Sequence, residues 1–126
     1  MTTPVERMRS LRWAGELLAL LACDAGVPPS IRSSARTLQS EFPRPTAIEQ
    51  HLVRRATALP SDWVISLLRA QTLFEVIAQT DRGDQSTRSK LRLTMRHYPD
   101  RQTITLMGSW AALADWLQPE QSASSD

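Results

Sequence analysis

The chain of 126 residues has little of several residue types, and each shortage excludes a class of protein. Its single cysteine, Cys23, excludes a framework of internal disulfides and is typical of a reducing compartment. Its four glycines form no glycine-rich loop of the kind that cradles phosphate groups. No apolar run is long enough to span a bilayer. We therefore expect a cytoplasmic protein that does not enter a membrane.

The side chains that carry most enzyme chemistry are also scarce. The two histidines, His51 and His97, do not fall at metal-ligand spacing with Cys23, and these three side chains cannot close a structural zinc site alone. No motif pairs a nucleophile with a base, and the carboxylates are scattered along the chain. We predict a protein that is not an enzyme, with no catalytic residues, no metal and no cofactor.

A lipoprotein signal is an alternative interpretation of the N-terminal region. Three arginines precede an apolar stretch that ends in Leu20-Leu21-Ala22-Cys23, the pattern of a lipoprotein cleavage site. Glu16 interrupts that stretch, whereas a signal peptide needs an unbroken apolar segment. The same apolar positions recur later in the chain, where no signal could function, so we favour a folded helix here.

A repeat is the main organising feature of the sequence. Shifted by 56 residues, positions 3–50 align without a gap on positions 59–106, and twelve of the 48 pairs are identical. Conservative pairs such as Phe42 with Tyr98 lie between the identities. Composition alone would give about three or four identities, so a duplication is favoured over two unrelated helical stretches. The units would be 1–58 and 59–118, followed by a disordered tail at 119–126.

Helical periodicity runs through both units. Apolar residues recur at steps of three and four in the first helix of each unit, and prolines or a polar loop separate the helices. The second helix of the first unit should run from Ser30 to Glu41, and a closing helix should run from Ser109 to Leu117. We predict an all-α fold, with two tandem copies of a roughly three-helix unit packed as one small domain.

Residues 90–107 also allow a different interpretation. Leu91, Leu93 and Met95 alternate with polar residues, as do Ile104 and Leu106, around a turn-forming segment. Taken alone, this pattern predicts a β-hairpin and an α+β fold. The repeat alignment predicts helix at the same positions, and we favour it.

The opening Thr3-Pro4-Val5-Glu6-Arg7 and the later Arg96-His97-Tyr98-Pro99 carry a resemblance. Together they resemble a family of short uncharacterised proteobacterial proteins, which begin in the Thr-Pro-x-Glu-Arg manner and have an Arg-His-Tyr-Pro helix ending. In the first unit the second motif is reduced to Ser40-Glu41-Phe42-Pro43. The resemblance implies a bacterial origin and this organisation, and it implies no activity.

Basic residues form the strongest local feature. Lys90 is the sole lysine among fifteen basic residues, and arginine suits bidentate contacts to carboxylate or phosphate. The net charge of only +2 means that binding would need a clustered patch. Arg88, Arg92 and Arg96 recur at four-residue steps, which places them on one helix face, opposite Leu91, Met95 and Tyr98. Equivalent positions of the first unit carry Arg32 and Arg36.

These positions lead to two functional hypotheses. The first is a bacterial protein-interaction module, such as a mobile-element accessory or an inhibitor, that binds an acidic protein surface. Its candidate contacts are Arg88, Lys90, Arg92, Arg96, Arg32, Arg36 and, as an aromatic anchor, Trp110. The second is a nucleic-acid-binding regulator that contacts phosphates through the same face. A solvated helix face is the simpler interpretation of the arginines. An unpaired apolar groove would make a homodimer natural.

Overall fold

The computed structural model describes residues 4–53, 59–80 and 82–108, and these residues form helices joined by short loops. The helices are α1 (Pro4–Cys23), α2 (Pro29–Glu41), α3 (Pro45–Val53), α4 (Ser61–Thr80), α5 (Gln85–His97) and α6 (Arg101–Met107). The prediction of an all-helical fold is confirmed for this part of the chain. The predicted closing helix at 109–117 and the tail at 119–126 lie outside the described residues.

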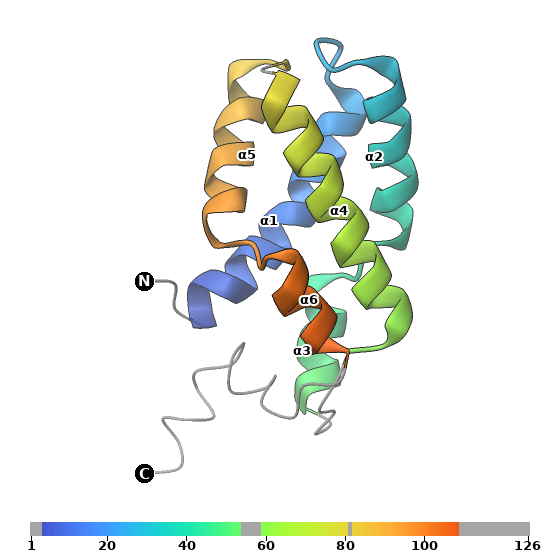
Figure 1. The fold of residues 1–126 in the computed structure, drawn as a ribbon, viewed down its shortest axis with the longest axis vertical. Coiled ribbons are helices and arrows are strands. Elements are labelled where there is room, and N and C mark those ends of the chain that lie inside the picture. The colour runs from blue at the N-terminus through green and yellow to red at the C-terminus, as the bar shows by residue number, and fades with distance from the viewer. Residues whose placement is uncertain (1–3, 54–58, 81, 109–126) are drawn as a thin grey trace.

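The alternative hairpin at 90–107 is wrong, because these residues form α5 and α6 (Figure 1). Side chains are buried at helical steps, at Leu91 and Thr94 in α5 and at Ile104 and Met107 in α6. A strand would have to bury Leu91 and Leu93 on the same face, whereas Leu93 is 45% exposed.

Proline and aspartate start most of the helices. Pro4, Pro29 and Pro45 stand at the first position of α1, α2 and α3, where a missing N–H costs no hydrogen bond. Asp84 and Asp100 cap α5 and α6, each accepting a hydrogen bond from the backbone N–H three residues later, at 2.9 Å and 2.7 Å. The local sequence therefore determines where these helices begin.

Helices α1, α2, α4 and α5 form a bundle, which α3 and α6 close at one end (Figure 1). Helix α1 packs against both α2 and α5, and α4 packs mainly against α2 and α6. The buried apolar side chains of both halves belong to a single core. In that core the rings of Phe74 and Tyr98 meet edge to face, with centroids 5.6 Å apart.

The two halves have matching local structure. Helices α2 and α5 each have 13 residues, and their starts, Pro29 and Gln85, are 56 positions apart. Both end on an extended aromatic residue, Phe42 or Tyr98, whose N–H bonds the carbonyl four residues earlier. Buried residues also recur at this spacing, in the pairs Ser10 and Ser66, Leu11 and Leu67, Ala14 and Ala70, Leu17 and Leu73, Leu21 and Ile77, and Ile48 and Ile104.

The halves differ in how closely their first two helices pack. Helices α1 and α2 are in close contact along their length, whereas α4 and α5 touch far less. At two equivalent positions the side chains differ in size. Ala35 and Gly26 of the first half correspond to Leu91 and Arg82 of the second. An open seam therefore lies between α4 and α5.

Among the described residues, no helix is both long enough and apolar enough to cross a membrane.

Candidate functional site

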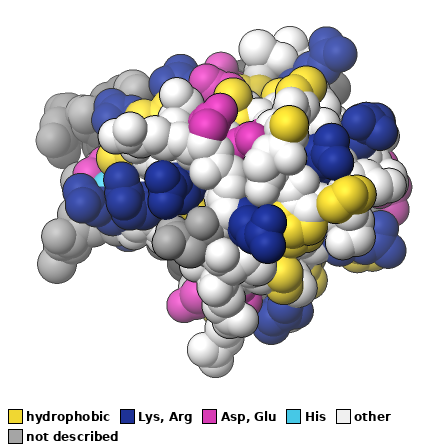
Figure 2. Space-filling model, turned by 90° about the horizontal axis from the view of Figure 1, so that it is seen from above, with side chains coloured by type: hydrophobic (Ala, Val, Ile, Leu, Met, Phe, Trp, Pro, Cys, Tyr) yellow, Lys and Arg dark blue, Asp and Glu magenta, His cyan; other side chains and the backbone are white. Residues whose placement is uncertain are grey.

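The open seam between α4 and α5 is a surface hollow of about 460 Å³. It is lined by four arginines and by apolar side chains, and we call it the arginine hollow. Its lining residues are Ile77, Ala78, Arg82, Arg88, Leu91, Arg92, Met95 and Arg96. None of these lining residues is acidic. Figure 2, seen from the end of the bundle where α4 meets α5, shows Lys and Arg side chains in a row on one side of the molecule.

Three arginines predicted as a group, Arg88, Arg92 and Arg96, do line one site. Their relation to the apolar residues differs from the prediction. Leu91 and Met95 line the same hollow and do not lie on the opposite face of the helix. A step of three residues turns a helix by about 300°, so these side chains stand only about 60° from the arginines before them. The hollow therefore combines cationic walls with an apolar floor.

Arg82 was missed by the sequence prediction because it lies in the loop before α5 and outside the four-residue series. The signal that could have found it is its partner position in the repeat, Gly26.

The loop that carries Arg82 is held by a carboxylate from the first half. Asp24 accepts hydrogen bonds of 2.8 Å from the backbone N–H groups of Gly26 and Asp84 and from the hydroxyl of Thr87. The hydrogen bond from Asp84, followed by those from Thr87 and Gly26 and the charge of Arg32, lowers the pKa of Asp24 despite its desolvation. Asp24 thus ties the two loops at this end together.

Gly83 makes this contact possible. Its φ of +102° lies in the region that favours glycine, and an added Cβ would approach an oxygen of Asp24 to 3.1 Å. The start of α5, and with it Arg88, is therefore set by Asp24, Gly83 and the cap Asp84.

Lys90 lies away from the arginine hollow. Its ammonium group is 3.5 Å from a carboxylate oxygen of Glu16 and 5.1 Å from the ring centroid of Trp13, both on α1. Only 23% of its side chain is exposed. Lys90 therefore packs between α1 and α5 and helps to hold these two helices together.

Arg32 and Arg36 lie on α2, and neither lines the arginine hollow. Arg36 donates to the carbonyl oxygen of Ala22 at the end of α1, at 3.5 Å, and the charge of Arg32 acts on Asp24. These two side chains therefore interact with the end of α1 and the loop that follows it.

The aromatic candidate Trp110 lies outside the described residues. Of the other tryptophans, Trp63 packs partly buried against the core, and His51 meets its ring edge to face at 5.3 Å between centroids. The Nε2 atom of His97 lies 3.2 Å from a carboxylate oxygen of Glu6. Within the described ranges, no group of three or more His, Cys, Asp or Glu side chains could hold a metal ion.

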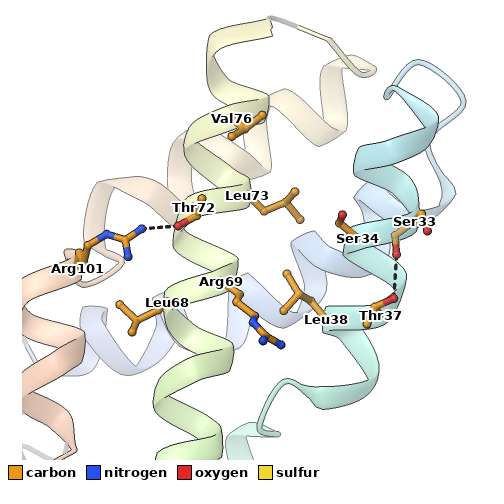
Figure 3. A pocket seen from close by; sticks show the side chains of 10 residues that line it. All are labelled: Ser33, Ser34, Thr37, Leu38, Leu68, Arg69, Thr72, Leu73, Val76 and Arg101. Carbon is orange, nitrogen blue, oxygen red and sulfur yellow. Dashed lines mark hydrogen bonds between the residues drawn. The ribbon is translucent and has the colours of Figure 1, made fainter.

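A second hollow, of about 500 Å³, lies between α2 and α4, and we call it the α2–α4 groove (Figure 3). In Figure 3, Leu38 and Leu73 point toward one another across it. Hydroxyl groups of Ser33, Ser34 and Thr37 stand on the α2 side. Arg101 reaches from α6 and donates to the hydroxyl of Thr72. Nothing in the sequence alone indicated this groove, because it depends on how α2 and α4 face one another.

Comparison of the chain with models of known protein families, with curated proteins and with solved structures finds no match in any of the three. The resemblance to short proteobacterial proteins therefore stays a prediction from the sequence. The functional argument rests on the residues of the site.

Proposed function

We propose that this chain is a non-enzymatic binding module whose arginine hollow takes an acidic segment of another protein. The observation that carries the proposal is the gathering of Arg82, Arg88, Arg92 and Arg96 around one hollow with no acidic lining residue. Guanidinium groups bind carboxylates through paired, charge-assisted hydrogen bonds. Like charges brought together on one surface favour a partner of opposite sign.

The floor of the hollow favours a protein segment over nucleic acid. Leu91 is buried, Met95 is partly buried, and both lie between the arginines. A phosphate backbone offers no apolar group to cover such a floor, and binding to phosphates needs only exposed cations. A segment in which acidic residues alternate with aliphatic ones satisfies both the walls and the floor. Binding to nucleic acid through the same arginines remains the alternative, and the experiment below separates the two.

We also propose that the chain arose by tandem duplication and that the second copy acquired the binding site. The equal lengths of α2 and α5 support this, as do the paired buried positions. In the first copy, which has Ala35 and Gly26, α1 and α2 pack closely. In the second copy, Leu91 and Arg82 occupy the equivalent positions and line the hollow instead. We propose that these two substitutions opened the seam of the second copy.

The setting that we propose is the bacterial cytoplasm, with the chain acting as an accessory or inhibitor of another protein. The small size of the chain and the arginine hollow, a site with binding chemistry only, support such a role. The α2–α4 groove is partly apolar and could be covered by a second copy of the chain, which would make a homodimer. Measurement of the oligomeric state in solution tests for this homodimer.

The test is fluorescence anisotropy with two labelled probes, a peptide of alternating Glu and Leu and a short duplex DNA of mixed sequence. We expect the peptide to bind, and the double variant Arg92→Glu, Arg96→Glu to weaken binding by at least about tenfold, because each lost pair is charge-assisted. The matched control is Arg12→Glu, Arg44→Glu, which makes the same change of charge at exposed positions outside the hollow. The control should bind the peptide as the wild type does.

A third variant separates the two partners. Met95→Gln makes the floor more polar and leaves every charge in place, so it should weaken binding of the peptide but not of DNA. Failure of the peptide to bind at low salt would contradict the proposal. Strong, salt-dependent binding of DNA that Met95→Gln leaves unchanged would support the nucleic-acid alternative instead.

A further inference from the structure

The α2–α4 groove has a filled counterpart elsewhere in the bundle. Under the shift of 56 residues α1 corresponds to α4 and α2 to α5, so the seam of α1 with α5 is equivalent to the groove. In that seam the ammonium group of Lys90 lies 5.1 Å from the centroid of the Trp13 ring and 3.5 Å from a carboxylate oxygen of Glu16. An aromatic ring, a cation and a carboxylate therefore meet between these two helices.

The equivalent positions of the groove hold neither a ring nor a carboxylate. They are Arg69 for Trp13, Ser34 for Lys90 and Thr72 for Glu16. A hollow of about 500 Å³ remains between α2 and α4, a size typical of small-molecule sites. The two groups that the groove lacks are therefore the groups that a ligand would bring.

The floor of the groove offers apolar surface from both helices. Leu38 of α2 and Leu73 of α4 face one another across it (Figure 3). Leu68 and Val76 extend the apolar lining along α4, and Val76 is 45% exposed. A flat aromatic ring placed between these side chains removes apolar surface from water on both of its faces.

Arg69 supplies a positive charge next to this floor. Its guanidinium group points from α4 toward the space beside Leu38 in Figure 3. It lies 3.6 Å from a carboxylate oxygen of Glu41, and the two side chains are 62% and 44% exposed. An ion pair so exposed contributes little, which leaves Arg69 available to a bound carboxylate. None of the described residues that line the groove is acidic, so such a carboxylate meets no like charge there.

Hydroxyl groups complete the polar part of the groove. Ser33, Ser34 and Thr37 line its α2 side. Thr37 donates to the carbonyl of Ser33 at 3.2 Å, and on α4 the hydroxyl of Thr72 accepts a hydrogen bond from Arg101. The groove thus combines one available guanidinium group, an apolar floor and several hydroxyl groups, which is the chemistry that recognises an anion with an apolar body.

We propose that the α2–α4 groove binds a small aromatic carboxylate. The ring lies between Leu38 and Leu73, and the carboxylate pairs with the guanidinium group of Arg69. The groove shares no lining residue with the arginine hollow, so this site is independent of the one proposed for an acidic segment. A second copy of the chain is the competing occupant, and a two-fold contact centred on the groove would set the cations of one copy against those of the other.

Titration of the full-length, ¹⁵N-labelled chain with indole-3-acetate tests the proposal by NMR. Amide signals of residues 33–38 and 68–76 should shift saturably at probe concentrations up to about 1 mM, and those of residues 88–96 should not. Indole-3-acetamide keeps the ring without the charge and should bind at least about tenfold more weakly, because a charge-assisted pair is lost. Acetate, which lacks the ring, should produce no saturable shift.

Two substitutions at one position separate charge from space. Arg69→Gln should weaken binding of indole-3-acetate about tenfold. The matched control is Arg44→Gln, which removes a charge at an exposed position outside the groove and should leave binding unchanged. Arg69→Trp fills the groove with a ring, as residue 13 does in the equivalent seam, and should abolish binding while circular dichroism shows an unchanged helical fold.

Three results would overturn the proposal. Equal binding of indole-3-acetate and indole-3-acetamide would mean that the groove does not recognise a charge. Saturable shifts confined to residues 82–96 would assign the probe to the arginine hollow. A homodimer that protects the amides of residues 33–38 and excludes the probe would make a second copy the occupant of the groove.

Discussion

The hydroxyl oxygen of Ser10 in α1 lies 3.2 Å from the backbone carbonyl oxygen of His97, at the end of α5, and 2.7 Å from that of Arg7 in its own helix, so the two carbonyls share its single proton. Ser66, the equivalent of Ser10 in α4, donates a hydrogen bond of 3.4 Å to the carbonyl of Glu41 at the end of α2. Glu41 and His97 are themselves equivalent, 56 positions apart. A serine of each half therefore contacts the last carbonyl group of the other half's second helix, and the two contacts are equivalent in the repeat.

Loss of either hydroxyl should destabilise the fold. Ser10→Ala and Ser66→Ala should each lower the free energy of unfolding by about 0.5–1.5 kcal/mol, because each removes a buried hydroxyl that bonds a carbonyl group. Urea denaturation followed by circular dichroism measures this. Ser40→Ala is the control, since Ser40 bonds the carbonyl of Thr37 within an exposed stretch of one helix. If Ser40→Ala lowers the free energy of unfolding as much as the two buried-serine variants do, the contacts between the halves contribute no extra stability.

Periodicity and end signals were sufficient to predict the helical class and, to within one residue, the bounds of α2. Asp84 and Asp100 are good caps in any sequence, and prolines mark the starts of three helices. The ambiguity at 90–107 arose because an alternating pattern also fits a strand. Burial decided it, since Leu91 is buried while Leu93 and Leu106 are exposed. That information lies in tertiary packing and is absent from a local pattern.

Three of the four arginines of the hollow were predicted, and the hollow itself was not. Four-residue spacing places Arg88, Arg92 and Arg96 together on any helix. The width of the seam between α4 and α5 depends on side-chain volume at the contact, which local periodicity does not report. For the same reason, the sequence grouped Lys90 with the arginines, whereas the structure places it against Trp13 and Glu16 on α1.

Substitution of two glycines by alanine should change the stability of the protein in opposite directions. Gly83→Ala should destabilise the protein by more than about 1 kcal/mol, because its φ of +102° strains an L residue and the Cβ crowds Asp24. Gly15→Ala should stabilise it by up to about 1 kcal/mol, because residue 15 lies inside α1 and its Cβ would make ordinary contact with Phe42 at 3.7 Å. Thermal unfolding of both variants provides the comparison. A destabilised Gly15→Ala would mean that α1 and Phe42 have no room for a methyl group.

Asp24 should make the stability depend on pH in the acid range. Its pKa is lowered in the folded state, chiefly by the N–H of Asp84, so the folded protein binds fewer protons there than the unfolded chain. The stabilisation is present above the unfolded pKa of about 4 and is lost as the pH falls through the lower folded value. At neutral pH, Asp24→Asn should cost about 1 kcal/mol.

The cost of Asp24→Asn should shrink in acid, because the wild type loses its charge there and the variant has none to lose. Denaturation of both proteins at neutral pH and in acid gives the difference. Glu49→Gln, at an exposed position of α3, is the control and should show no such change. A cost for Asp24→Asn that stays constant with pH would mean that the three hydrogen bonds do not depend on the charge.

Tyr98 is the single tyrosine of the chain, which makes its ionisation directly observable. Its hydroxyl donates to the carbonyl of Leu67 at 2.8 Å, and burial raises its pKa well above the usual 10.0. Tyrosinate absorbance should therefore stay absent in the folded protein at about pH 11, where an exposed tyrosine has ionised. In denaturant the same absorbance should rise near pH 10.

The raised pKa of Tyr98 also determines how the stability of the protein changes at alkaline pH. Above about pH 10 the unfolded chain releases the phenolic proton while the folded protein keeps it, so stability falls as the pH rises. Tyr98→Phe should cost about 1 kcal/mol at neutral pH and remove this part of the alkaline loss. The ring itself is tolerated, because Phe42 occupies the equivalent position in the first half. Tyrosinate absorbance that appears near pH 10 in the native protein would contradict the buried hydrogen bond.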